Sequence, residues 1–107
     1  MAVHFVHAPY MKASRDKLAE LYAQGADIVY TERWKASDDA RYTFTDTPSY
    51  ISFLPTILLV DTDHKTVLAR IEHPQHITKA NIDWLHQQHA TWVKGGKKGK
   101  FPKPPWA

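Results

Sequence analysis

The order of apolar and polar positions near the start of the chain predicts a strand, a helix and a second strand. Val3–His7 is short, apolar and rich in β-forming residues, which is typical of a central strand. Residues 11–23 place their apolar side chains near one helical face and precede Gly25, so we expect an amphipathic helix that ends there. Residues 26–31 predict a second strand, parallel to the first because a helix connects the two.

The second half of the chain predicts two antiparallel strands and a closing helix. Thr56–Val60 is a continuous apolar run, as expected for a strand that is covered on both faces. Turn-forming residues follow it, and Thr66–Ile71 predicts a strand that returns antiparallel. Residues 78–93 carry one apolar stripe at helical spacing. Together these elements predict an α/β domain whose four-stranded mixed sheet is flanked by helices.

The middle of the chain gives a weaker pattern. Residues 33–53 mix serine, threonine and aspartate with scattered aromatic residues. Residues 37–39, Ser-Asp-Asp, predict the cap of a short helix that extends to Phe44, and Pro48 indicates a further helical turn up to Phe53. A structureless loop of about 20 residues would be unusual in a compact domain. We therefore expect a shortened helix in this region.

Length and composition fit one globular domain. The chain has 107 residues, of which 43% are hydrophobic and 23% charged, as is ordinary for a soluble protein with a buried core. No apolar run approaches the roughly 20 residues that a membrane span requires, so we expect no membrane contact. The first ten residues have neither a basic start nor a long apolar stretch, unlike a signal peptide. We therefore expect a cytoplasmic location, or one inside a viral particle.

Charge is distributed unevenly along the chain. The formal charge is +3, but every lysine after Val93 lies in a segment without acidic residues, and residues 1–93 hold nine basic against eleven acidic residues. Glycine and proline separate these lysines, which predicts a flexible tail. The chain therefore divides into a domain, residues 1–93, and a basic tail, residues 94–107. The lysines of the tail are Lys94, Lys97, Lys98, Lys100 and Lys103.

The composition of the tail favours contact with a partner. Lysines attract the phosphates of a polyanion such as nucleic acid, and Phe101 and Trp106 can stack on bases. Alternatively, these two aromatic residues dock onto a protein partner or onto the domain itself. A tail that only keeps the chain soluble is the remaining interpretation, and the presence of Trp106 argues against it.

The start of the chain resembles the first strand and helix of the glutaredoxins. Residues 3–23 read VHFVHAPYMKASRDKLAELYA, and in that family the strand leads into a Cys-Pro-Tyr-Cys motif at the head of the helix. The four corresponding residues here are Ala8, Pro9, Tyr10 and Met11.

A second segment resembles the other half of a thioredoxin. Residues 50–85 contain a buried strand after a proline, a hairpin, a second strand and a closing helix. Pro55, in Leu54-Pro55-Thr56, occupies the place where that family keeps a cis-proline facing the redox site. The resemblance implies that the Leu54–Pro55 bond is cis. It also implies that the backbone of Leu54 hydrogen-bonds to partner peptides.

The resemblance implies a thioredoxin-like fold without thiol chemistry. Dithiol exchange requires a thiolate, and the chain contains no cysteine. We therefore expect a redox-inactive, non-enzymatic binding module without cofactors. Its expected role is an accessory or structural subunit of a larger protein or nucleoprotein assembly, for example a virion, to which its basic tail docks. The residues expected to contact partners are Pro9, Tyr10, Met11, Leu54 and Pro55 in the domain, and Lys94, Lys97, Lys98, Lys100, Phe101, Lys103 and Trp106 in the tail.

Other interpretations stay open. One is a thiol-independent glutathione-handling domain that uses Tyr10 or Ser14, by resemblance to the glutathione transferases. Another is that position 8 or 11 replaces a native cysteine, which would restore a redox function. The seven histidines match no zinc-binding signature, so we expect no metal.

Overall fold

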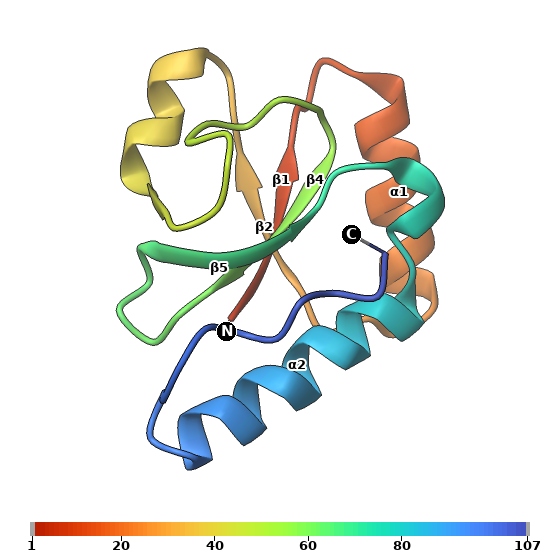
Figure 1. Cartoon of the computed structure of the whole chain (residues 1–107). Helices are drawn as coiled ribbons and strands as arrows, with labels where there is room; N and C mark the ends of the chain where they lie inside the picture. Colours follow the sequence, from red (N-terminus) through yellow and green to blue (C-terminus); the bar gives the residue numbers. More distant parts are fainter. Residues whose placement is uncertain (1, 107) are drawn as a thin grey trace.

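The computed structural model of the chain describes residues 2–106 (Figure 1). Residue 1 of the predicted domain and residue 107 of the predicted tail lie outside the described residues. The elements along the chain are β1 (Val3–His7), α1 (Lys12–Ala23), β2 (Val29–Glu32), the 3-10 helix η1 (Ala36–Arg41), β3 (Thr43–Phe44), β4 (Thr56–Val60), β5 (Thr66–Ile71), the 3-10 helix η2 (Pro74–His76) and α2 (Lys79–Lys94).

The strands form one open, mixed sheet in the order β2-β1-β4-β5-β3. Strand β1 is parallel to β2 and antiparallel to β4, β4 is antiparallel to β5, and β3 is parallel to β5. The predicted α/β class and mixed sheet are confirmed. The predicted number of four strands is wrong, because the two-residue strand β3 adds a fifth at the edge beside β5.

Strand β3 forms because the chain returns to the edge of the sheet before β4 begins. The Thr43 amide donates to the carbonyl of Lys65 at 2.8 Å. Both the amide and the hydroxyl of Thr45 donate to the carbonyl of Val67. An edge strand otherwise exposes unpaired backbone groups. Because Thr45 and Val67 are 22 positions apart, no local pattern in the sequence indicates this pairing.

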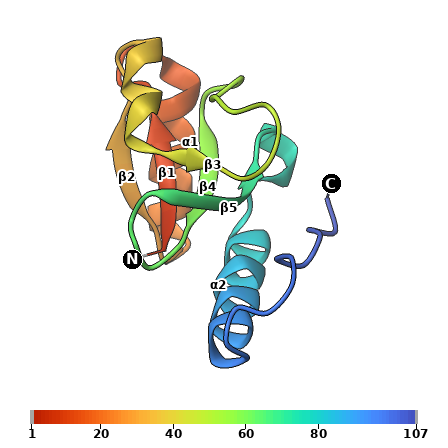
Figure 2. The same cartoon turned by 60° about the vertical axis from the view of Figure 1, so that its left-hand side comes forward.

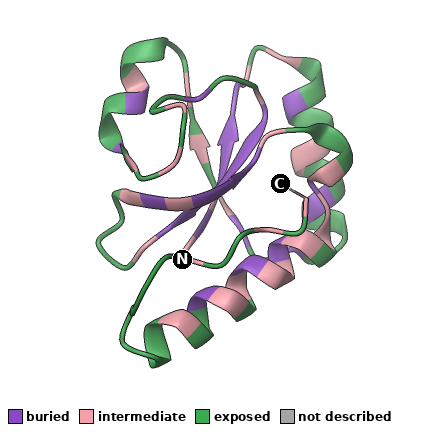
Figure 3. Cartoon of the chain, viewed as in Figure 1, coloured by how far each residue is buried: buried purple, intermediate pink, exposed green. Residues whose placement is uncertain are grey.

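Both long helices cover the same face of the sheet, where the larger hydrophobic core lies (Figure 3). Leu21 of α1 and Leu85 of α2 are fully buried there against Phe5 of the central strand β1. Each such side chain stabilises the fold by about 1.5–3 kcal/mol through burial alone. The buried members of this core are Val3, Phe5, Leu21, Ala26, Ile28, Ile57, Leu59, Ala69, Ile71, Ile77, Ile82 and Leu85.

The opposite face of the sheet carries a smaller core, covered by the irregular segment between η1 and β4. Tyr42 and Ile51 of that segment pack over the sheet, with Phe44 and Leu54 partly buried at the margin. The members contributed by the strands are Val6, Leu58, Val60 and Val67. Side chains of β4 enter the two cores alternately, which explains why this strand reads as a continuous apolar run.

Both long helices end in the same hydrogen-bonded pattern, in which a glycine has a positive φ. At the end of α1, Gly25 has φ +74° and the amides of Gly25 and Ala26 donate back to the last turn. At the end of α2, Gly96 has φ +84° and the amides of Gly96 and Lys97 do the same. This arrangement pairs carbonyls that the helix leaves without partners, and glycine adopts its left-handed conformation without steric cost.

Most predicted bounds agree with the structure. Strands β1, β4 and β5 have the predicted limits, and α1 begins one residue later, at Lys12. Helix α2 begins at Lys79, because the Thr78 hydroxyl caps it by accepting the amide of Asn81 at 3.2 Å. Strand β2 begins at Val29, later than predicted, because the residues before it complete the end of α1.

The middle of the chain contains less helix than the sequence predicts. A 3-10 helix, η1, stands where a helix up to Phe44 was predicted, but it ends at Arg41 and Phe44 belongs to β3. Asp38 fixes the start of η1 by accepting the amides of Trp34 and Lys35 at 2.8 and 3.2 Å. The predicted helical turn is not formed, since residues 48–53 are irregular. The role of Asp38 at η1 is a common one, because an aspartate near the start of a helix can accept backbone amides that have no partner within the helix.

The C-terminal segment, residues 95–106, differs most from its prediction as a flexible tail. It turns back beside α2 and runs toward β5 (Figures 1 and 2). Phe101 and Trp106 pack against the larger core and contact the ring of Trp84 edge to face. The Trp106 indole also donates to the carbonyl of Arg70 at 3.0 Å. Docking of the aromatic residues onto the domain itself is therefore what the structure shows.

Candidate functional site

One end of the sheet gathers the domain residues that the sequence singled out. Strand β1 ends there before the turn of residues 8–11, and β4 begins there after Pro55 (Figure 1, top). Val6 lies opposite Thr56 in the antiparallel register, so Pro55 and the turn belong to the same end. The Leu54–Pro55 bond is cis, which confirms that prediction. We call this region the turn face.

Hydrogen bonds from α1 hold the turn of residues 8–11 in place. The Ala8 amide donates to the Ser14 hydroxyl at 3.2 Å, and the Met11 amide donates to the carbonyl of Ala8 at 2.9 Å. The guanidinium of Arg15 donates to the carbonyl of Pro9 at 2.8 Å. Ser14 is fully buried, so its hydroxyl serves the backbone and is not presented to a ligand at the surface.

Two large aromatic side chains project from the turn face. Tyr10 and Trp34 are each 58% exposed, and their ring centroids lie 6.1 Å apart. Trp34 is held in position, because its indole donates to Glu32 at 3.0 Å and its amide donates to Asp38. The bond from the Trp34 amide is the main cause that holds the pKa of Asp38 below its ordinary value. The sequence analysis did not single out Trp34. The signal that could have found it is Asp38, four residues later, whose carboxylate accepts the Trp34 amide.

The other side of the turn face is formed by the residues before the cis-proline. Pro55 is buried and Leu54 half-buried, whereas Tyr50 and Phe53 remain 57% and 50% exposed. Phe53 contacts the ring of His73 at a centroid distance of 5.4 Å. Within residues 2–106, the Leu54 amide has no hydrogen-bond partner, so it can donate to an incoming backbone.

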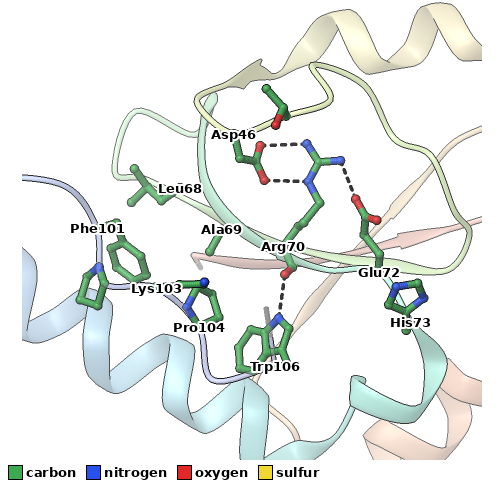
Figure 4. A pocket seen from close by; sticks show the side chains of 12 residues that line it. Asp46, Leu68, Ala69, Arg70, Glu72, His73, Phe101, Lys103, Pro104 and Trp106 are labelled. Atoms are coloured by element: carbon green, nitrogen blue, oxygen red, sulfur yellow. Dashed lines mark hydrogen bonds and ion pairs between the residues drawn. The ribbon is translucent and has the colours of Figure 1, made fainter.

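Arg70 of β5 positions the loop that carries these residues (Figure 4). Its side chain is only 7% exposed, and it forms a bidentate pair with Asp46 at 2.7 and 2.8 Å. The same guanidinium donates to Glu72 and to the carbonyls of Pro48 and Tyr50. All five guanidinium donors are thereby used. No local pattern indicates this role, because Asp46 lies 24 positions before Arg70.

His7 is the buried titratable group beneath the turn. It is 7% exposed, and its Nδ1 has no hydrogen-bond partner among residues 2–106. Burial lowers the pKa of His7, which outweighs the opposing effect of Glu32. The ring contacts Tyr30 edge to face at 6.0 Å. His7 is therefore a neutral packing residue at neutral pH rather than a charged ligand for an anion.

Lys97 of the C-terminal segment lies at the other end of the sheet. Lys97 donates to Asp61 at 3.0 Å and to the hydroxyl of Thr62. Asp61 directly follows β4, whereas Pro55 precedes it, so the strand separates the two sets of predicted residues. The structure therefore brings Pro9, Tyr10, Met11, Leu54 and Pro55 together and places Lys97 at the opposite end of β4. Lys103 lies beside β5, in the pocket described next.

Between the C-terminal segment and β5 lies a pocket of about 560 Å³ (Figure 4). Leu68, Ala69 and Glu72 line one side, and Phe101 and Lys103 line the other. It lies beside β5 rather than on the turn face.

Two kinds of site are not found in the described part of the chain. Residues 2–106 contain no group of three or more histidine, cysteine, aspartate or glutamate side chains arranged to hold a metal ion. In the same residues, no helix combines the length and apolar character that crossing a membrane needs.

Comparison with known proteins adds no relative. No family model, no curated protein and no solved structure matches the chain.

Proposed function

We propose that the chain is a redox-inactive, thioredoxin-like binding module that acts as an accessory or structural subunit of a larger assembly. The order of the four longer strands, β2-β1-β4-β5, with a cis-proline before β4, supports the thioredoxin-like assignment. The absence of cysteine supports the loss of thiol chemistry.

One observation carries the binding role: the turn face presents large, positioned aromatic rings in place of reactive groups. Tyr10 and Trp34 are more than half exposed although Trp34 is fixed by two hydrogen bonds. Tryptophan and tyrosine are enriched among the residues that dominate binding energy at protein interfaces. A ring that is already held loses little conformational freedom when it binds. The unpaired Leu54 amide supplies a donor for an extended partner segment.

The test is capture of the partner from the native host with the full chain and with Tyr10→Ala/Trp34→Ala. Because two interface anchors are removed, we expect retention of the partner to fall by at least about 10-fold. The matched control is Tyr22→Ala, which removes a tyrosine 48% exposed near the end of α1, away from the turn face.

Two outcomes would contradict the proposal. Equal loss of the partner in the control variant would place the contact elsewhere. Thiol-dependent reduction of insulin above the rate without protein would show redox chemistry that the proposal excludes.

A further inference from the structure

The lysines of residues 94–103 are exposed on a segment whose backbone path is set by the fold. The end of α2 sets the path of the chain there, because Gly96 and Gly99 have φ +84° and +73° and Lys97 has φ +57°. Lys97 is bonded to Asp61, and Phe101 is packed against Trp84 and Trp92. We call this surface, residues 94–103, the basic loop.

The pairing of charges leaves most of these lysines available. Lys97 is the member with a carboxylate partner, and within residues 2–106 the other four form no ion pair. These four, Lys94, Lys98, Lys100 and Lys103, are all exposed. Asp61, in the turn after β4, is already paired with Lys97, and residues 94–103 themselves contain no acidic residue. Lys103 lines the pocket beside β5 that Asp46 and Glu72 also line. The basic loop therefore keeps an excess of positive charge.

We propose that the basic loop binds the phosphate backbone of nucleic acid, independently of base sequence. Lysine ammonium groups are compact point charges that suit phosphate oxygens. The aromatic residues that would read or stack on bases, Phe101 and Trp106, face inward and contact Trp84. Contacts to phosphate alone carry no information about the base sequence.

The same geometry argues against the two other polyanionic partners. Stable attachment to a lipid surface combines a basic patch with an apolar or acylated anchor, and here the aromatic side chains are packed onto the domain. Protein interfaces are depleted in lysine and enriched in arginine and exposed aromatic residues. The basic loop contains no arginine. Because the basic loop shares no residue with the turn face, this proposal does not depend on the proposed protein contact.

The experiment measures binding of the full chain to a labelled DNA duplex of about 20 base pairs by fluorescence anisotropy, in about 50 to 200 mM salt. If four lysines contact phosphates, the slope of log K against log salt is about −3.6, and affinity falls about 100-fold across this range. Substitution of Lys94, Lys98, Lys100 and Lys103 by glutamine should flatten the slope and remove most of the binding.

The matched control removes the same charge elsewhere, by substituting Lys12, Lys17, Lys35 and Lys79 with glutamine. Its affinity for the duplex should stay within about 3-fold of that of the original chain. Charges far from the bound phosphates act weakly, because salt screens them at these concentrations. Both variants keep Lys97 and its bond to Asp61, and thermal unfolding verifies that they fold.

Three results would overturn the proposal. These are no binding at the lowest salt, an equal loss in both variants, or binding to vesicles rich in phosphatidylserine without binding to the duplex. None of these three results changes the outcome of the capture experiment, which tests the turn face. The two proposals can therefore be contradicted independently of each other.

Discussion

At the scale of single residues, buried polar groups decide how the irregular half of the chain is held. Arg70 bonds to two carboxylates and to two backbone carbonyls, and its guanidinium stacks on Phe44 at 4.9 Å. Arginine suits this position because its planar fork supplies several donors in fixed directions. The segment that carries Tyr50 and Phe53 therefore depends on one side chain of β5.

We predict that Arg70→Met destabilises the protein by about 3 kcal/mol, because it leaves the carboxylates of Asp46 and Glu72 partly buried without their cation. Urea denaturation measures the loss. The control is Arg15→Met, which removes an exposed arginine that bonds a carbonyl and should cost less than about 1 kcal/mol. Equal effects of the two substitutions would mean that Arg70 does not organise the loop.

At the scale of elements, the C-terminal segment behaves as an additional layer on α2. It contributes no regular backbone pairing, since prolines remove donors, and it is held by its aromatic residues. Edge-to-face aromatic pairs add about 0.5–1.5 kcal/mol beyond the burial of area. The segment that the sequence predicts as a flexible tail therefore contributes to the stability of the fold.

Trp106→Ala tests this contribution. We expect a loss of about 2 kcal/mol in the free energy of unfolding, because the substitution removes the contact with Trp84 and the bond to the Arg70 carbonyl. Thermal unfolding provides the measurement, with Lys103→Ala as a control for an exposed position in the same segment. An unchanged transition in Trp106→Ala would show that the segment is detached in solution.

At the scale of the whole molecule, the turn after β4 links three parts of the fold. Asp61 bonds to His89 of α2 and to Lys97 of the basic loop. Partial burial acts to raise the pKa of Asp61, but bonds from the Thr62 amide, His89 and Lys97 bring it below its ordinary value. Bonds from the hydroxyl and amide of Thr66 and from the Lys65 amide lower the pKa of Asp63 to about 2.

These shifts predict a loss of stability in acid. Because the folded pKa of Asp63 lies below its unfolded value of about 3.9, its contribution is present above about pH 4 and disappears as the pH falls toward 2. Thermal unfolding between pH 5 and pH 2 should therefore show a smaller decrease in Asp63→Asn than in the original chain.

The control for this prediction is Asp16→Asn, whose carboxylate lies exposed on α1 and bonds to Lys12 rather than to backbone amides. Its acid transition should follow that of the original chain. An identical decrease in Asp63→Asn would mean that this turn does not carry the acid sensitivity.

The sequence by itself determined β1, β4, β5 and, within one residue, both long helices. Each of these elements has a hydrophobic period or a stop signal contained in its own residues, such as Gly25 after α1. It also determined the absence of thiol chemistry and predicted the cis bond before Pro55 by resemblance.

Only the tertiary structure decided β3, the anchoring of the middle loop and the docking of the C-terminal segment. The bonds that hold these features join distant residues: Thr45 to Val67, Asp46 to Arg70, and Trp106 to Arg70 are 22, 24 and 36 positions apart. Local patterns reflect which face of an element is buried. Which buried donor meets which acceptor across the fold is fixed only when the chain is packed, because an unpaired buried polar group is costly wherever its partner lies in sequence.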